Sequence, residues 1–196
     1  MNHDTHSHLQ LSSDPCKDKL SDLEYLEHMI PHHQVAIDMS NLLIPNSQND
    51  KILHLCRDII RKQSYEIWEM EHMKKYTDDL FRDKHINAEK IITKLDMYNP
   101  ILSKSKDGNC NPLFFKPNDH SQHMEHMEIT DESYLEHMIP HHQVAVDMSQ
   151  RLLLHTNNSY LIEFCRKLII DQQGEIYYMN NLIKNRFNYK SILLTQ

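Results

Sequence analysis

The sequence has few turn-forming residues and no feature that would direct it to nucleic acid or to a charged membrane. Only 2 of its 196 residues are glycine, which argues against an all-β fold with many tight turns and favours long helices. The formal net charge is −7, and no local cluster of lysine and arginine occurs. We therefore expect neither nucleic acid nor a membrane as a partner.

Long apolar runs are missing as well. The first twenty residues contain no apolar core of a signal peptide, and no run of about eighteen apolar residues occurs in the chain. We expect a soluble protein that is cytoplasmic by default. The cysteines lack C-x-x-C spacing, so we predict neither a disulfide framework nor a closed zinc knuckle.

Histidine and methionine are abundant instead, with 16 His and 11 Met. The stretch YLEHMIPHHQVAIDMS at residues 25–40 returns at residues 134–149 with one change, Ile37 to Val146. The similarity continues beyond this stretch without a gap, so the repeated unit is roughly fifty residues long.

Each copy of the repeat predicts two helices. The first runs from Asp22 to about Leu43, or from Asp131 to about Leu152, and the aspartate is expected to cap its free backbone N–H groups. After a polar break, a second helix is predicted over roughly 51–76 and 160–185. The fold class is therefore all-α, because two helical hairpins supply the four helices of a simple bundle.

The two repeats, at residues 21–80 and 130–188, are expected to form one domain. Residues 1–20 are predicted to be a disordered tail that contains histidines. Residues 81–129 are predicted to be a linker that could form an extra helix and that contains a His/Met-rich loop.

Helical periodicity divides the histidines of the first helix between two stripes. His33 lies near the centre of the apolar face, with Met29 at its flank, and is expected to point into the core. A second stripe, away from that centre, carries His28, His32 and Met39. Pro31 could kink the helix and bring the stripes together, or the helix could begin afresh there.

The inner face of the second helix includes polar side chains that need partners. They are Gln63 and Glu66 in the first repeat, and Gln172 and Glu175 in the second. Burying one of them unpaired would cost about 1–3 kcal/mol, so each requires a hydrogen bond or a cation. His33 and His142 are the expected partners, because a carboxylate that accepts one imidazole N–H leaves the other nitrogen available to a metal.

Methionine next to imidazole indicates a soft metal, Cu(I) or by analogy Ag(I), rather than iron or zinc. The predicted ligands are Met29, His32, His33, Met39, Met70, Met138, His141, His142, Met148 and Met179, and the residues expected to orient the imidazoles are Gln63, Glu66, Gln172 and Glu175. Further candidate ligands are His28, His137, Cys56, Cys165, His123, Met124, His126 and Met127.

The pattern D-x-x-[FY]-x-x-M-I-x-H-H-Q-x-A-[IV]-x-M, followed further along by Q-x-x-E-I-x-x-M, occurs in both repeats. It resembles the family known as domain of unknown function 305. The resemblance implies a ferritin-like four-helix bundle made of two such hairpins, and binding of copper or silver. Cys56 and Cys165 depart from the family, which often has alanine there.

Two other interpretations stay open beside a copper-binding protein. A ferritin-type di-iron oxidase would need Glu-x-x-His on two helices, and the first repeat has Glu69 and His72 where the second has Tyr178 and Asn181. The other alternative is a metal-free structural module whose buried histidines respond to pH. A binding protein is preferred over an enzyme.

Overall fold

The computed structural model describes residues 20–75 and 129–193, with side chains up to residue 185. These ranges form four helices, α1 (Asp22–Leu43), α2 (Asp50–Lys75), α6 (Asp131–Leu152) and α7 (Ser159–Leu193), and contain no strand. The predicted tail, the extra helix and the loop with His123, Met124, His126 and Met127 lie outside the described residues.

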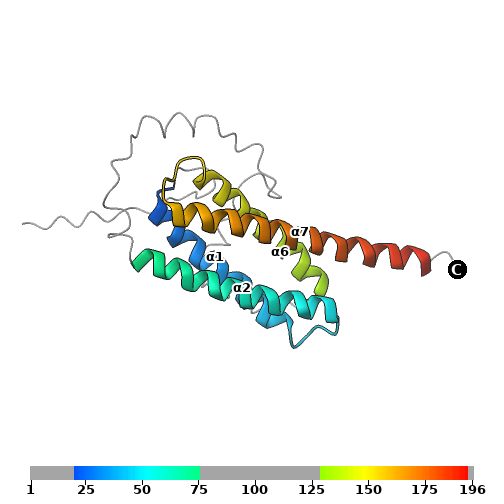
Figure 1. Ribbon diagram of the computed structural model, residues 1–196. Coiled ribbons are helices and arrows are strands. Elements are labelled where there is room, and N and C mark those ends of the chain that lie inside the picture. Colours follow the sequence, from blue (N-terminus) through cyan, green and yellow to red (C-terminus); the bar gives the residue numbers. More distant parts are fainter. Residues whose placement is uncertain (1–19, 76–128, 194–196) are drawn as a thin grey trace, which may run out of the picture.

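The helices form two hairpins that pack into one bundle (Figure 1). Helix α1 packs against α2, α6 packs against α7, and α1 also packs against α6. The predicted all-α fold of two repeated hairpins is confirmed. Within the described residues, no helix is long and apolar enough to cross a membrane.

The helix boundaries agree with the predicted ones except at the end of α7. Helices α1 and α6 have the predicted bounds, and α2 begins and ends one residue early. Helix α7 continues to Leu193 rather than ending near residue 185, and its last part extends beyond the other helices (Figure 1). Residues 186–193 contain no glycine or proline, so nothing in that stretch breaks the helix.

The helix caps lie one residue before the predicted ones. The Ser21 hydroxyl accepts the Glu24 backbone N–H at 3.2 Å, and the Glu24 carboxylate accepts the Ser21 backbone N–H at 2.8 Å. Thr130 forms the equivalent box at the start of α6. The expectation that Asp22 and Asp131 cap these helices is wrong, although both lie in the first turn, where a negative charge interacts favourably with the helix dipole.

Proline does not interrupt either repeated helix. Pro31 lies inside α1 and Pro140 lies inside α6, and both helices continue on either side. The alternative in which the first helix begins afresh at Pro31 is therefore wrong. A continuous helix keeps the histidines before and after the proline in one register.

Two hydrogen bonds join the hairpins symmetrically. The hydroxyls of Tyr25 and Ser149 are 2.7 Å apart, and those of Ser40 and Tyr134 are also 2.7 Å apart. Each bond links α1 to α6, and all four residues are buried. The repeat therefore generates an approximate two-fold arrangement, in which a residue of one hairpin has a counterpart 109 positions away in the other.

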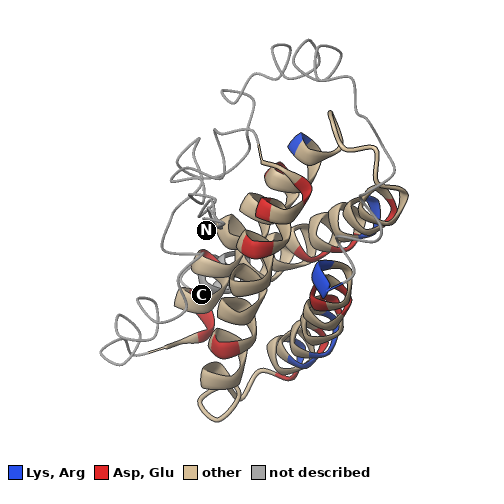
Figure 2. Cartoon of the chain, turned by 90° about the vertical axis from the view of Figure 1, so that its left-hand side faces the viewer, with Lys and Arg blue, Asp and Glu red and all other residues tan. Residues whose placement is uncertain are grey.

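Charge is distributed unevenly over the bundle. Helix α1 carries no lysine or arginine, and Arg151 is the one basic residue of that kind in α6. Figure 2 shows acidic residues along these two helices and most of the basic residues on α2 and α7. The surface formed by α1 and α6 is therefore favourable to cations.

Candidate metal site at the bundle centre

Two histidine–glutamate pairs are buried near the middle of the bundle. His33 Nε2 is 2.8 Å from Glu66 Oε2, and His142 Nε2 is 2.8 Å from Glu175 Oε2. Because an ionised carboxylate can only accept, Nε2 carries the proton in each neutral imidazole, and Nδ1 keeps its lone pair. These contacts have the geometry expected for Glu66 and Glu175 as residues that orient imidazoles.

The second nitrogen of each of these imidazoles has no hydrogen-bond partner in the described part of the chain. Nδ1 of His33 and Nδ1 of His142 are inaccessible to solvent and make no hydrogen bond with the described residues. Leaving such an acceptor unsatisfied costs about 1–3 kcal/mol. Both atoms are therefore suited to a ligand that accepts a lone pair.

His32 and His141 stack on each other where α1 passes α6. Their ring centroids are 3.7 Å apart with an interplanar angle of 25°, and both residues are fully buried. The sequence places His32 on a stripe away from the centre of the apolar face, and this second stripe of α1 is buried here because it packs against α6. The sequence pattern identified the face towards α2, and the second hairpin covers the other one.

Burial strongly disfavours protonation of the stacked histidines. Desolvation lowers the pKa of His32 well below its ordinary value, and the nearby His33 and His142 lower it further. Desolvation likewise lowers the pKa of His141, with His32 as the next largest cause. Both rings are therefore neutral at physiological pH and are chemically able to act as ligands.

Lys62 makes the two glutamates unequal. Its Nζ lies 2.8 Å from Glu175 Oε1, and it links α2 to α7. Burial alone would raise the pKa of Glu175, but its interactions with His142 and Lys62 lower it to about 2. The position equivalent to Lys62 in the second repeat is Asp171, so Glu66 has no corresponding lysine. Lys62 was not among the predicted site residues because its partner is on the other hairpin.

Gln63 and Gln172 do not orient the imidazoles as expected. Both amides are buried, but neither their oxygens nor their nitrogens have a hydrogen-bond partner among the described residues. The role assigned to them from the sequence is therefore not supported by any contact. They add four more unsatisfied polar atoms to the interior of the bundle.

The predicted methionine ligands form two buried groups, and each group draws on both hairpins. The first methionine group consists of Met29, Met70 and Met148, and the second of Met39, Met138 and Met179. Met39 and Met148 each lie with the methionines of the other hairpin. The two methionine groups therefore follow the two apolar clusters of the bundle rather than the two repeats.

Helical register places one histidine next to each methionine group. Met29 precedes His33 by four residues on α1, and Met70 follows Glu66, the partner of His33, by four residues on α2. Four residues correspond to a rise of about 6 Å along a helix. Because α1 and α2 run antiparallel, Met29 and Met70 lie towards the same end of the bundle from the His33–Glu66 contact. The first methionine group therefore lies about one helical turn from His33.

The two described cysteines are buried thiols in these same clusters. Cys165 is in the cluster of the first methionine group, and Cys56 is in that of the second. Burial raises the pKa of Cys165 to about 12, although hydrogen bonds with Tyr25 and Ser149 oppose the change. Burial also raises the pKa of Cys56. Both are therefore protonated thiols at neutral pH, and either would have to lose a proton to become a thiolate ligand.

His28 and His137 lie one turn before the stacked pair and are half-buried. Burial lowers the pKa of His28, while Glu24 and Glu27 oppose this effect. Within the described residues, no group of three or more His, Cys, Asp or Glu side chains has the arrangement of a metal site. A site built from these residues would need methionine sulfur.

Comparisons with known proteins agree with this architecture. A family model described as "Domain of unknown function (DUF305)" matches residues 22–183. A curated relative, the uncharacterized protein L153 of Acanthamoeba polyphaga mimivirus, is 38% identical over 58 residues. That match covers 30% of this chain and 38% of the relative, so the chain spans about two fifths of that relative's length.

Solved structures of CopM have a similar fold. The Ag-bound, Cu(I)-bound and Cu(II)-bound forms have TM-scores of 0.61, 0.58 and 0.59 to this chain, with sequence identities of 24%, 24% and 25%. Each match covers 86% of this chain and 98–99% of CopM. A DUF305 fragment from Deinococcus radiodurans gives a TM-score of 0.51 at 23% identity, covering 83% of this chain and 95% of the fragment.

Proposed function

Starting from the fact that the chain belongs to the DUF305 family, we propose that it binds a soft monovalent cation, Cu(I) or Ag(I), in the interior of its bundle. The proposed role is copper sequestration or handling. The observation that carries this proposal is a buried imidazole nitrogen, without a hydrogen-bond partner among the described residues, about one helical turn from each methionine group.

The donor set determines the class of metal. Thioether sulfur and neutral imidazole are soft or borderline ligands that suit Cu(I), whereas Mg²⁺, Ca²⁺ and Mn²⁺ prefer oxygen ligands. The structures of CopM in Cu(I)-bound and Ag-bound forms support the same choice. Iron and zinc are disfavoured because the described residues offer no cluster of three His, Cys, Asp or Glu ligands.

Each proposed site combines three methionines with one histidine. The first uses Met29, Met70 and Met148 with Nδ1 of His33, and the second uses Met39, Met138 and Met179 with Nδ1 of His142. The stacked rings of His32 and His141 lie between the two sites and are proposed as alternative ligands.

The glutamates have an electrostatic role in this proposal. Glu66 and Glu175 are each in contact with the imidazole of one site. A cation enclosed in a bundle interior requires a compensating charge, and a carboxylate behind each imidazole supplies it without binding the metal itself. The same contact makes the other imidazole nitrogen a better electron-pair donor.

A Cu(I) competition titration under anaerobic conditions tests this function. The two-fold arrangement supplies matched variants, Met29→Leu/Met70→Leu and Met138→Leu/Met179→Leu, because leucine preserves most of the volume of methionine. We expect each double variant to lose one of the tightly bound equivalents of the wild type. His54→Asn, which removes an exposed histidine of α2, should leave the titration unchanged.

The variant His33→Ala/His142→Ala tests the imidazoles directly. It should weaken the binding of both Cu(I) ions in the bundle interior, while circular dichroism shows that the helices are retained. If the wild type fails to compete with even a weak chelator, the proposed function is wrong. If all variants bind as the wild type does, copper is held elsewhere in the chain.

A further inference from the structure

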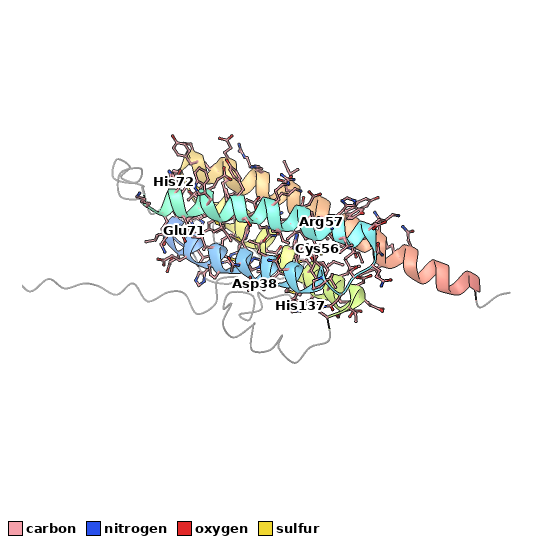
Figure 3. All side chains as sticks on the ribbon, turned by 90° about the horizontal axis from the view of Figure 1, so that it is seen from below. Asp38, Cys56, Arg57, Glu71, His72 and His137 are labelled. Atoms are coloured by element: carbon pink, nitrogen blue, oxygen red, sulfur yellow. The ribbon has the colours of Figure 1, made fainter. Side chains whose placement is uncertain are left out.

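A surface cavity of about 330 Å³ lies between the C-terminal half of α2 and the first turns of α7. Its walls include Trp68, Glu69, His72 and Met73 of α2, and Glu163 and Phe164 of α7. Figure 3 labels His72 near the C-terminal end of α2, and Cys56 near the opposite end of the same helix. The cavity therefore lies near one end of the bundle, separate from the central histidines.

This cavity is adjacent to the first methionine group. Phe164 belongs to the same buried cluster as Met29, Met70 and Met148, and Met73 is partly buried against that cluster. The exposed fraction of Phe164 is only 8%. A side-chain layer that includes Phe164 and Met73 thus separates the cavity from the interior thioethers.

The chemistry of the cavity suits a soft cation. Met73 contributes a thioether, His72 an imidazole and Glu69 a carboxylate. Glu69 Oε2 is inaccessible to water and has no hydrogen-bond partner among the described residues. A carboxylate oxygen in that situation favours a cation beside it.

Aromatic rings complete the wall of the cavity. The Trp68 and His72 ring centroids are 4.9 Å apart, with an interplanar angle of 31°. The electron-rich face of an indole attracts a cation. Lys167 also lines the cavity, and its positive charge opposes the binding of a cation. Its Nζ lies over the Tyr65 ring, 5.4 Å from the centroid, and Glu163 in the same wall provides a compensating negative charge.

The two hairpins differ at this position. The counterparts of His72 and Met73 in the second repeat are Asn181 and Leu182, and the counterpart of Glu69 is Tyr178. Neither thioether, imidazole nor carboxylate is available at these three positions of α7. The approximate symmetry that makes the interior groups equivalent therefore does not extend to the surface.

We propose that this cavity is a port at which a soft monovalent cation binds transiently through Met73, His72 and Glu69 before it passes to the first methionine group. This inference rests on the proposed function, because it presumes that the interior binds such an ion. It predicts that the first methionine group fills faster than the second, since the counterparts of Met73, His72 and Glu69 beside the second group provide no thioether, imidazole or carboxylate.

Trp68 provides a direct reporter, because it is the single tryptophan of the protein. We would mix the full chain with Ag(I) in a stopped-flow instrument, in chloride-free buffer, and follow indole fluorescence, with total Ag(I) uptake measured separately by equilibrium dialysis. The wild type should show a fast fluorescence change that depends on Ag(I) concentration. This change should precede the binding of the total amount of Ag(I) that dialysis measures.

The test variant is His72→Asn/Met73→Leu, which introduces the residues found at the counterpart positions. The apparent affinity of this variant for Ag(I) in the fast phase should fall at least about tenfold, which corresponds to a loss of about 1.4 kcal/mol of binding free energy. Met73→Leu alone, a change that nearly preserves volume, should give a smaller loss in the same direction. His54→Asn, outside the cavity, should behave as the wild type.

A further variant separates the port from the interior. Met29→Leu/Met148→Leu alters the first methionine group, and it should retain the fast phase if the port binds the ion first. If this variant loses the fast phase, or if His72→Asn/Met73→Leu retains it at wild-type affinity, the port is wrong. Both results leave the proposed function intact, whereas the absence of any Ag(I) uptake by the wild type would overturn both.

Discussion

Replacing Glu175 by glutamine should destabilise the metal-free protein substantially. This carboxylate accepts hydrogen bonds from His142 Nε2 through Oε2 and from Lys62 Nζ through Oε1, both at 2.8 Å. Its residue is only 8% exposed, so little solvent screens these contacts. Glutamine retains the size of the side chain but removes the charge that both partners stabilise.

The pKa of Glu175 gives the magnitude of the loss. Lowering this pKa from 4.5 to about 2 corresponds to roughly 3 kcal/mol of additional native-state stability at neutral pH. Because the folded-state pKa is depressed, the stabilisation is present in full above the unfolded-state pKa. It is lost as the pH falls from about 4.5 towards 2, so the two proteins should become more alike in acid.

Glu66→Gln is the matched control. Glu66 makes the same contact with His33, at 2.8 Å, but Asp171 stands at the position equivalent to Lys62, so the replacement of Glu66 should cost less than that of Glu175. Lys62→Met should cost under about 1 kcal/mol, because the Lys62 side chain is a third exposed. Urea denaturation at pH 7, with similar dependence on urea for all variants, gives the free energies of unfolding. A loss below about 1 kcal/mol for Glu175→Gln would show that the contacts with His142 and Lys62 do not stabilise the ionised carboxylate in the folded protein.

Three further outcomes follow from the structure. Gly174→Ala should stabilise the protein by about 0.5–1 kcal/mol, because Gly174 is inside α7 and an added Cβ meets nothing within 4 Å. The melting temperature should rise, and a lower melting temperature would contradict this prediction. Tyr25→Phe and Tyr134→Phe should each lower the free energy of unfolding, measured in urea, by about 1–2 kcal/mol, since each removes one buried 2.7 Å hydrogen bond between α1 and α6. The two losses should be similar, and a large difference between them would show that the two ends of the bundle are not equivalent. Burial lowers the folded-state pKa of His32 and His141 below 6.5. The metal-free protein should therefore keep its full stability above that pH and lose stability as the pH falls below it. A melting temperature that stays constant from about pH 8 to 5 would rule this out.

The helices could be predicted because their signals are local. The repeated apolar pattern and the polar breaks set the bounds of α1 and α6 correctly and those of α2 within one residue. The caps were predicted one residue late because serine, threonine and aspartate are all good capping residues. Ser21 and Thr130 each directly precede the predicted aspartate, so that only backbone geometry distinguishes the two positions.

Contacts within one hairpin were accessible to sequence reasoning, whereas contacts between hairpins were not. His33 and Glu66 lie on the facing sides of two consecutive helices, which periodicity identifies. The burial of His32 depends on α6, and the pairing of Met39 with Met138 depends on how the two hairpins cross. A single helical wheel contains no information on that crossing.

The cavity beside Trp68 was missed for a related reason. Its residues come from the C-terminal half of α2 and the start of α7, which are far apart in sequence. The sequence MEHM at residues 70–73 places His72 and Met73 together near the end of a helix, but it gives no indication that Glu163 and Phe164 lie opposite them. The departure from the repeat at Asn181 and Leu182 was the available sign that the two ends differ.

Anomalous diffraction from a crystal of Ag(I)-loaded protein would show directly whether the bundle interior binds the metal. We expect strong peaks among Met29, Met70 and Met148 and among Met39, Met138 and Met179, each within coordination distance of the imidazole of His33 or His142. An interior without peaks, with silver bound only at surface residues, would contradict it.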